Sequence, residues 1–377
     1  MKFFARIIPG SAGVPTGSFL LALALLALGF AFACAPHHHT GDDDVSADDD
    51  DDDNDNNDVS PGDDDASPVD DDDDNDDDFS WSGMSSGTSA RLSGVWGSSA
   101  RDVFAVGLGG TIVHHDGASW SAMNSGTTTA WLSGVWGSSA SDVFAASFDG
   151  TILHYDGSSW SAMFSGTADL SLNGVWGSAS SDVFVAGFYS SNQRGVILHY
   201  DGSSWSATSN ENTIGQLSGV WGSSSSDVFV VGFGDSGSVI LHYDGSSWST
   251  VTNPTIVVGG TSVWGTSPTD VFDVGNGILQ YDGLAWSSDP CVICVVAGLY
   301  GVWGSSSTDV FAVGGWWTES GYLLATVILH YDGSSWSEMK IPTMSRPVQL
   351  NGVWGASGAD VFAVGDQGTI LHYGPPE

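Results

Sequence analysis

Residues 80–373 are built from one unit of about 40 residues, and most of that unit recurs seven times. The unit reads LSGVWGSSxxDVFAVGxxGTILHYDGSSWSxM. A period of this length is the signature of a repeat architecture, so it constrains the fold more than any other feature. The first tryptophan of the unit recurs at Trp96, Trp136, Trp176, Trp221, Trp264, Trp303 and Trp354, and the second at Trp120, Trp160, Trp205, Trp248, Trp286 and Trp336.

Each unit contains four short runs that favour β-strands, separated by turn-forming residues. In the second unit the runs are 132–137, 142–146, 151–155 and 159–163. The 51 glycines and 17 tryptophans of the chain suit tight hairpins and a packed core, whereas glycine and serine are weak helix formers. Four antiparallel strands per repeat predict the blade of a β-propeller.

The two ends of the repeat region complement each other. The last unit stops after its third strand, while residues 80–88 match a fourth strand that has no unit of its own. An amino-terminal strand that completes the last blade closes a ring, whereas an open solenoid, the alternative, needs polar caps. The sequence therefore predicts an all-β, seven-bladed β-propeller of four-stranded antiparallel blades over residues 79–377.

The VWG, DVF and DGxxW motifs resemble those of bacterial exported repeat propellers of the tectonin and kelch-like kind. The resemblance covers nearly all of residues 80–373. It implies the propeller architecture, and it implies sugar binding in so far as tectonin-type members are lectins. It implies no single activity, because propellers carry many unrelated functions.

The amino terminus has the pattern of an export signal. Lys2 and Arg6 precede an apolar run at residues 19–32, which is too short for a membrane span. Ala31, Phe32 and Ala33 lead into Cys34, which resembles a bacterial lipobox and implies lipidation of Cys34. We therefore expect residues 1–33 to be a lipoprotein-type signal peptide and the protein to be anchored at a bacterial membrane, at the outer membrane or the cell surface. Cleavage after Ala33 without lipidation is the alternative.

Residues 34–78 are predicted to form an unfolded acidic tether. They hold 22 aspartates and no apolar periodicity, so like charges keep the segment extended. Residues 53–58 alternate Asp and Asn in a way that suits weak Ca²⁺ binding, but the glycine and distal glutamate of a calcium loop are missing. No other cofactor is expected.

The charge of residues 79–377 restricts the partners. This part has 23 acidic and five basic residues, a net charge of −18, within a chain of net charge −38. Nucleic acid needs lysine and arginine to displace its counterions, so we expect no nucleic-acid partner. We expect a monomeric propeller that binds a glycan or a protein, if it binds a ligand at all.

Residues that recur in every unit are interpreted as structural. The tryptophan of VWG and the phenylalanine of DVF should pack between blades. The aspartate of DVF should cap a turn. The histidine of the third strand, as in His154, suits either a metal-binding ring or a hydrogen-bonded structural role, and we favour the latter.

Differences in loop length point to the binding face. The interval from the first Trp to the Asp is six residues in all seven units, whereas the interval from the Phe to the third-strand His or Gln is 10, 10, 15, 13, 8, 19 and 10. The variable loops join the second and third strands (B–C), so they share one face. Since loops on a rigid scaffold collect binding residues, we predict ligand contacts at Tyr189, Arg194, Trp316, Trp317, Glu319 and Tyr322.

The remaining motifs carry less chemistry. Cys291 and Cys294 form a lone C-x-x-C without the second pair that a zinc site needs, and the export signal predicts a local disulfide. No catalytic constellation stands out. An exported glycoside hydrolase and a structural surface protein without a small ligand stay open as alternatives to a binding module.

Overall fold

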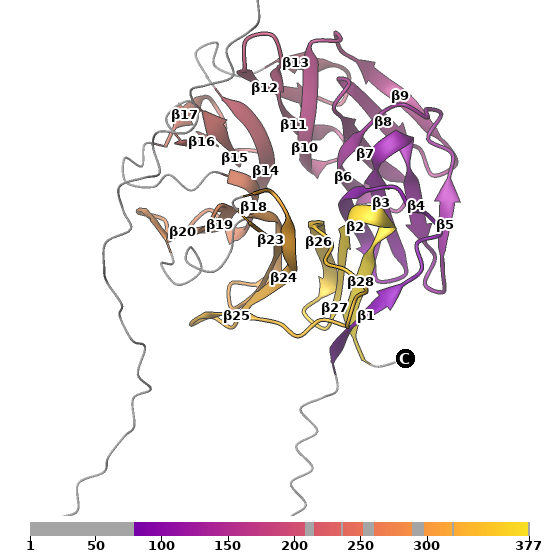
Figure 1. Cartoon of the computed structure of the whole chain (residues 1–377). Helices are drawn as coiled ribbons and strands as arrows, with labels where there is room; N and C mark the ends of the chain where they lie inside the picture. The colour runs from indigo at the N-terminus through magenta and orange to yellow at the C-terminus, as the bar shows by residue number, and fades with distance from the viewer. Residues whose placement is uncertain are drawn as a thin grey trace, which may run out of the picture. The chain divides into compact units, whose positions relative to one another are not determined.

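Seven four-stranded antiparallel sheets surround a central axis in the computed structural model (Figure 1). The structure describes residues 79–207, 215–234, 237–251, 260–288, 298–318 and 320–375. Cys34, Cys291, Cys294, Glu319 and the acidic tether lie outside the described residues. The prediction of a seven-bladed propeller is confirmed.

The strands of each blade run from the axis outwards in chain order, except in the last blade. Blade 1 comprises β2 (Leu92–Ser99), β3 (Asp102–Gly107), β4 (Ile112–His115) and β5 (Trp120–Met123). Blade 2 comprises β6 (Leu132–Ser139), β7 (Asp142–Ser147), β8 (Thr151–Tyr155) and β9 (Trp160–Ser165). Blade 3 comprises β10 (Leu170–Ala179), β11 (Asp182–Tyr189), β12 (Arg194–Tyr200) and β13 (Trp205–Ala207). Blade 4 comprises β14 (Gln216–Ser224), β15 (Asp227–Gly234), β16 (Gly237–Tyr243) and β17 (Trp248–Thr250). Blade 5 comprises β18 (Gly260–Ser267), β19 (Asp270–Gly275), β20 (Ile278–Tyr281) and β21 (Trp286–Ser288). Blade 6 comprises β22 (Leu299–Ser306), β23 (Asp309–Trp317), β24 (Leu323–Tyr331) and β25 (Trp336–Glu338).

The last blade joins the two ends of the repeat region. It contains β26 (Leu350–Ser357), β27 (Asp360–Gly365), β28 (Ile370–Gly374) and, as its outer strand, β1 (Ser80–Met84). β1 pairs with β28 from Ser80 opposite Gly374 to Met84 opposite Ile370. Figure 1 shows β1 beside β28 at the start and the end of the colour scale. The predicted closure of the ring by the amino-terminal strand is confirmed.

Two single-turn 3-10 helices, η1 (Leu108–Gly110) and η2 (Asp366–Gly368), are the only helices in the described residues. Neither comes near the length or the apolar character of a membrane-spanning helix.

The apolar core consists of seven clusters, each formed by residues of two neighbouring blades. Between blades 1 and 2, for example, Phe104 packs with Leu132, Leu153 and Trp160. The phenylalanine of every DVF motif is at most 2% exposed. Because both faces of each sheet are covered, the middle strands read as continuous apolar runs.

The tryptophan of VWG links each blade to the next. Trp96 lies against Gly137 of blade 2, and a β-carbon at Gly137 would come within 2.6 Å of the Trp96 ring. The same contact recurs around the ring and ends with Trp354 against Gly97 of blade 1. The glycine after each tryptophan is therefore required by the tryptophan of the preceding blade.

The histidine of the third strand is bound within its own blade. In six blades its Nε2 lies 2.7–2.8 Å from Oδ1 of the DVF aspartate, as in His154 and Asp142. Ser138 Oγ donates to the other oxygen of Asp142 at 2.5 Å. The prediction that this aspartate caps a turn is wrong, because side chains use its carboxylate. No group of three or more His, Cys, Asp or Glu among the described residues could hold a metal ion.

Blade 5 departs from the repeat at two facing positions. Gly260 stands where the other blades have leucine, and Asp273 stands where they have alanine or valine. Asp273 is 1% exposed, and neither carboxylate oxygen has a hydrogen-bond partner in the described part of the chain. Its Oδ1 lies 2.7 Å from where a β-carbon on Gly260 would sit, so the carboxyl occupies part of the space of the missing leucine.

Candidate functional site

The two faces of the disc differ in regularity. One face carries the A–B and C–D hairpins, whose lengths are constant, and the other carries the B–C hairpins and the D–A links. Six C–D turns begin with an aspartate whose carboxylate accepts backbone N–H groups, as Asp156 does from Ser158 and Ser159. In this turn the Ser158 hydroxyl and both amides lower the pKa of Asp156 to about 2. The regular face therefore stays acidic over the whole physiological range.

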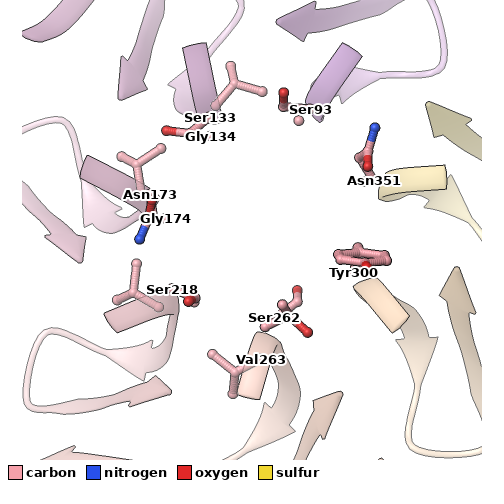
Figure 2. Close-up of a pocket in the computed structure, with 18 of the residues that line it drawn as sticks. Ser93, Ser133, Gly134, Asn173, Gly174, Ser218, Ser262, Val263, Tyr300 and Asn351 are labelled. Carbon is pink, nitrogen blue, oxygen red and sulfur yellow. The ribbon is translucent and has the colours of Figure 1, made fainter. Parts of the chain in front are cut away.

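The axis of the ring encloses a cavity of about 350 Å³ that Figure 2 shows in cross-section. Its wall is formed by the seven innermost strands. Each strand contributes a valine, from Val95 in blade 1 to Val353 in blade 7, and one residue two positions before it. These second residues form a polar ring of Ser93, Ser133, Asn173, Ser218, Thr261, Tyr300 and Asn351.

Several members of the polar ring connect adjacent blades. Ser133 Oγ donates to the carbonyl of Leu172 at 2.7 Å, and Asn173 Nδ2 donates to that of Leu217 at 2.6 Å. Thr261 and Asn351 make the corresponding bonds to Leu299 and Leu92. Close approach of the inner strands is possible because glycine follows the ring residue in six blades, and Ser262 replaces it in blade 5.

A charged network lies where blade 7 meets blade 1. Arg91 Nε is 3.2 Å from Asp366 Oδ1, and Arg91 donates to Asn351 Oδ1 at 2.8 Å. The guanidinium also lies 5.4 Å from the ring centre of Trp131 in the link to blade 2. Arg91 therefore holds three blades together on the B–C face, and the ion pair neutralises its charge in part.

Aromatic side chains border the cavity on the side of blades 2 and 3. Phe148 and Phe188 line it, and Phe148 is 36% exposed and packs against Trp131 with ring centres 4.7 Å apart. Tyr300 lines it from blade 6. Burial raises the pKa of the Tyr300 phenol, opposed by Arg91 and by the indole of Trp317, so the hydroxyl is neutral at physiological pH.

The predicted contact residues of blade 6 form a well-defined hairpin. Trp316 pairs with Ala325 and Trp317 with Leu323, and the Thr318 hydroxyl accepts the N–H of Tyr322 at 2.9 Å. Trp316 is 42% exposed and Tyr322 73%. Trp317 is half-buried beside Tyr300, so it joins the hairpin to the wall of the cavity. Glu319 lies outside the described residues.

The predicted residues of blade 3 lie elsewhere on the same face. Tyr189 pairs with Arg194 at the end of the B–C hairpin, and Tyr189 packs partly buried against the core of that blade. Blades 3 and 6 are three places apart in a ring of seven. The structure therefore does not bring Tyr189 and Arg194 together with the blade 6 hairpin, and the six residues do not make one site.

Loop length could not reveal Arg91, Phe148 and Tyr300. The signal that could have found Phe148 is the residue after the glycine or serine that ends the conserved part of strand B. It is Leu108, Phe148, Phe188 and Phe233 in blades 1 to 4, and Asn276, Gly315 and Asp366 in blades 5 to 7. The opening of the cavity therefore has an apolar side at blades 1 to 4 and a more polar side at blades 5 to 7.

The recurring Ser, Asp and His contacts do not resemble a hydrolytic triad. In each set the aspartate lies between the other two, so that Ser138 donates to Asp142 and not to His154. A nucleophilic serine needs the histidine as its direct base. The recurrence of these contacts in five blades favours a structural role.

No protein-family model and no curated protein sequence matches the chain. Among solved structures, YCF48 bound to D1 peptide is similar over 78% of this chain and 97% of its own length, with a TM-score of 0.61 and 17% identity. YCF48 from Cyanidioschyzon merolae covers 78% of this chain and 99% of its own, with a TM-score of 0.59 and 14% identity. Virginiamycin B lyase from Staphylococcus aureus covers 79% and 100%, with a TM-score of 0.64 and 13% identity. At these identities the likeness shows the propeller fold alone.

Proposed function

We propose that the chain is an exported, tethered binding module that recognises a polypeptide segment through its B–C face. The observation that carries the proposal is the blade 6 hairpin, on which Trp316, Tyr322 and Leu324 are all exposed. Exposed aromatic side chains on a rigid hairpin are typical anchors of protein interfaces. A glycan partner is the second candidate, because the same aromatic rings suit stacking against a sugar.

Two further observations support a polypeptide partner. One of the similar propellers was solved with a bound peptide, although its identity to this chain is only 17%. The net charge of −18 over residues 79–377 favours a neutral or basic segment over an acidic one. A basic side chain of the partner would also gain from contact with an indole ring.

The double substitution Trp316→Ala, Tyr322→Ala should abolish most of the affinity for a peptide selected from a random library on the full chain. Each anchor of this kind contributes about 2 kcal/mol, so the expected loss is on the order of 100-fold or more. Isothermal titration calorimetry measures the loss. Leu284→Ala is the matched control, because Leu284 is 91% exposed on the opposite face. Peptides that bind the double variant and the wild type equally would contradict the proposal.

We also propose that the mature protein is held at a membrane by a lipid on Cys34 and that residues 34–78 act as the tether. Cys34→Ser should then move the protein from the detergent phase to the aqueous phase in a detergent partition of cells that express it. The reason is that acyl chains supply nearly all of the membrane affinity of such a protein. A wild-type protein that already stays in the aqueous phase would disprove lipidation. The disulfide between Cys291 and Cys294 stays a prediction.

A further inference from the structure

We propose that the central cavity is a second binding site and that it takes one neutral, polyhydroxylated molecule of the size of a single hexose. The site uses none of the residues of the blade 6 hairpin that carry the proposed polypeptide contact. It therefore goes beyond the function proposed above and can fail or hold independently.

The dimensions and the charge of the cavity restrict the ligand. A volume of about 350 Å³ lies at the lower end of the range of small-molecule sites, which begins at about 300 Å³. All described residues that line it are uncharged. A charged ligand would lose its hydration there without gaining an opposite charge, so a neutral molecule fits best.

Three hydroxyl groups on consecutive blades are available to such a molecule. Ser218 of blade 4 and Ser262 of blade 5 line the cavity, and neither side-chain hydroxyl has a hydrogen-bond partner within the described ranges. The Tyr300 hydroxyl of blade 6 continues the row, as Figure 2 shows, and it keeps its own O–H for donation although the Trp317 indole lies against its oxygen. Each hydroxyl can donate one hydrogen bond and accept others. By contrast, the polar side chains of Ser133, Asn173, Thr261 and Asn351 are already engaged with the next blade.

Ser262 is the most specific of the three. It stands where the other six blades have the glycine that permits close approach of the inner strands. The fold therefore does not need a side chain there, and the hydroxyl is an addition to the repeat at a point that faces the cavity.

A neighbouring part of the wall offers an apolar contact. Phe148 and Phe188 line the cavity from blades 2 and 3, which come directly before the blades of the hydroxyl row in the ring. A pyranose ring has hydroxyl groups at its rim and C–H groups on its faces, so it can meet hydrogen-bonding groups on one side and an aromatic ring on the other. A linear apolar molecule would leave the three hydroxyls unpaired, and this arrangement therefore favours a sugar or a cyclitol.

Saturation-transfer NMR on the full chain tests the proposal with glucose, galactose, mannose, N-acetylglucosamine and myo-inositol. We expect at least one of them to bind in the low-millimolar range or tighter, and glucuronate to bind at least tenfold more weakly. The double variant Ser218→Ala, Ser262→Gly should weaken that ligand at least tenfold. The double variant should keep the melting temperature of the wild type, because blades 1 to 4, 6 and 7 already carry glycine at the position of Ser262.

Ser206→Ala, on the exposed outer strand β13, is the control and should bind the sugar as the wild type does. Two outcomes overturn the proposal. In the first, no neutral polyol of the panel gives saturation transfer, which means that the cavity holds only water. In the second, the double variant binds the sugar with the same affinity as the wild type. Peptide affinity measured on the same double variant separates this site from the polypeptide site, since the hairpin residues are intact in it.

Discussion

Deletion of residues 79–84 from the full chain should lower the free energy of unfolding by more than about 4 kcal/mol. These residues include β1, whose Trp81 is 4% exposed and packs edge-on against Phe311 of blade 6 with ring centres 6.3 Å apart. The Trp81 indole also donates to the sulfur of Met339 at 3.4 Å. Loss of one buried tryptophan alone costs about 3–5 kcal/mol, and loss of the strand also exposes the edge of β28.

Urea unfolding followed by tryptophan fluorescence measures this effect. Deletion of residues 63–68, six residues of the acidic tether, is the control of equal length and should leave the midpoint unchanged. A circular permutant that joins residue 374 to residue 79, with new ends between β5 and β6, should fold, because it keeps the pairing of β1 with β28. If the β1 deletion unfolds at the same urea concentration as the wild type, the strand does not hold the ring closed.

Replacement of Asp273 by valine should raise stability at neutral pH by roughly 2 kcal/mol. Burial raises the pKa of the Asp273 carboxyl well above its ordinary value of 3.8. In the unfolded chain this group ionises near pH 4, whereas in the folded chain it holds its proton to higher pH. The unfolded state is therefore favoured progressively as the pH rises from about 4 towards the folded pKa. Valine already occupies this position in blades 3 and 4, as Val185 and Val230, so its volume is tolerated by the repeat.

The pH dependence distinguishes the carboxyl from a simple packing effect. The difference in unfolding free energy between Asp273→Val and the wild type should be smallest at pH 4 and grow as the pH rises above it. Asp273→Asn, which cannot ionise but keeps a buried polar group, should lose the pH dependence while gaining less stability than valine. A difference that is equal at pH 4 and pH 8 would mean that ionisation of Asp273 has no part in it.

The recurring part of the sequence predicted the fold because each copy supports the same interpretation. Seven copies of Trp96 and its equivalents fixed the number of blades, and the unmatched Trp81 revealed how the ring closes. The role of Asp102 and its equivalents was misassigned because its partner, the third-strand histidine, is between 12 and 21 residues away in the sequence. A side-chain contact between two strands cannot be read from the turn that precedes one of them.

The candidate site was predicted only in part, for a geometric reason. Loop length identified the blade 6 hairpin, which does project exposed aromatic rings. It also suggested Tyr189 and Arg194, which share the face but lie three blades away. Residues at the axis, such as Ser262 and Phe148, change neither loop length nor strand pattern, so only a comparison of the seven copies position by position makes them visible.

The contact of each VWG tryptophan with the following blade has a consequence for how such a chain can arise. This contact forms a joint between two blades. Every copy carries both halves of such a joint, namely the tryptophan that packs against the following blade and the glycine against which the tryptophan of the preceding blade packs. Duplication of a whole unit therefore creates one new joint and leaves every old one intact, whereas loss of half a unit breaks two. A gene for this protein can gain or lose complete copies without any compensating substitution at the joints, and the curvature of the ring, rather than the chemistry of its contacts, sets how many copies close it.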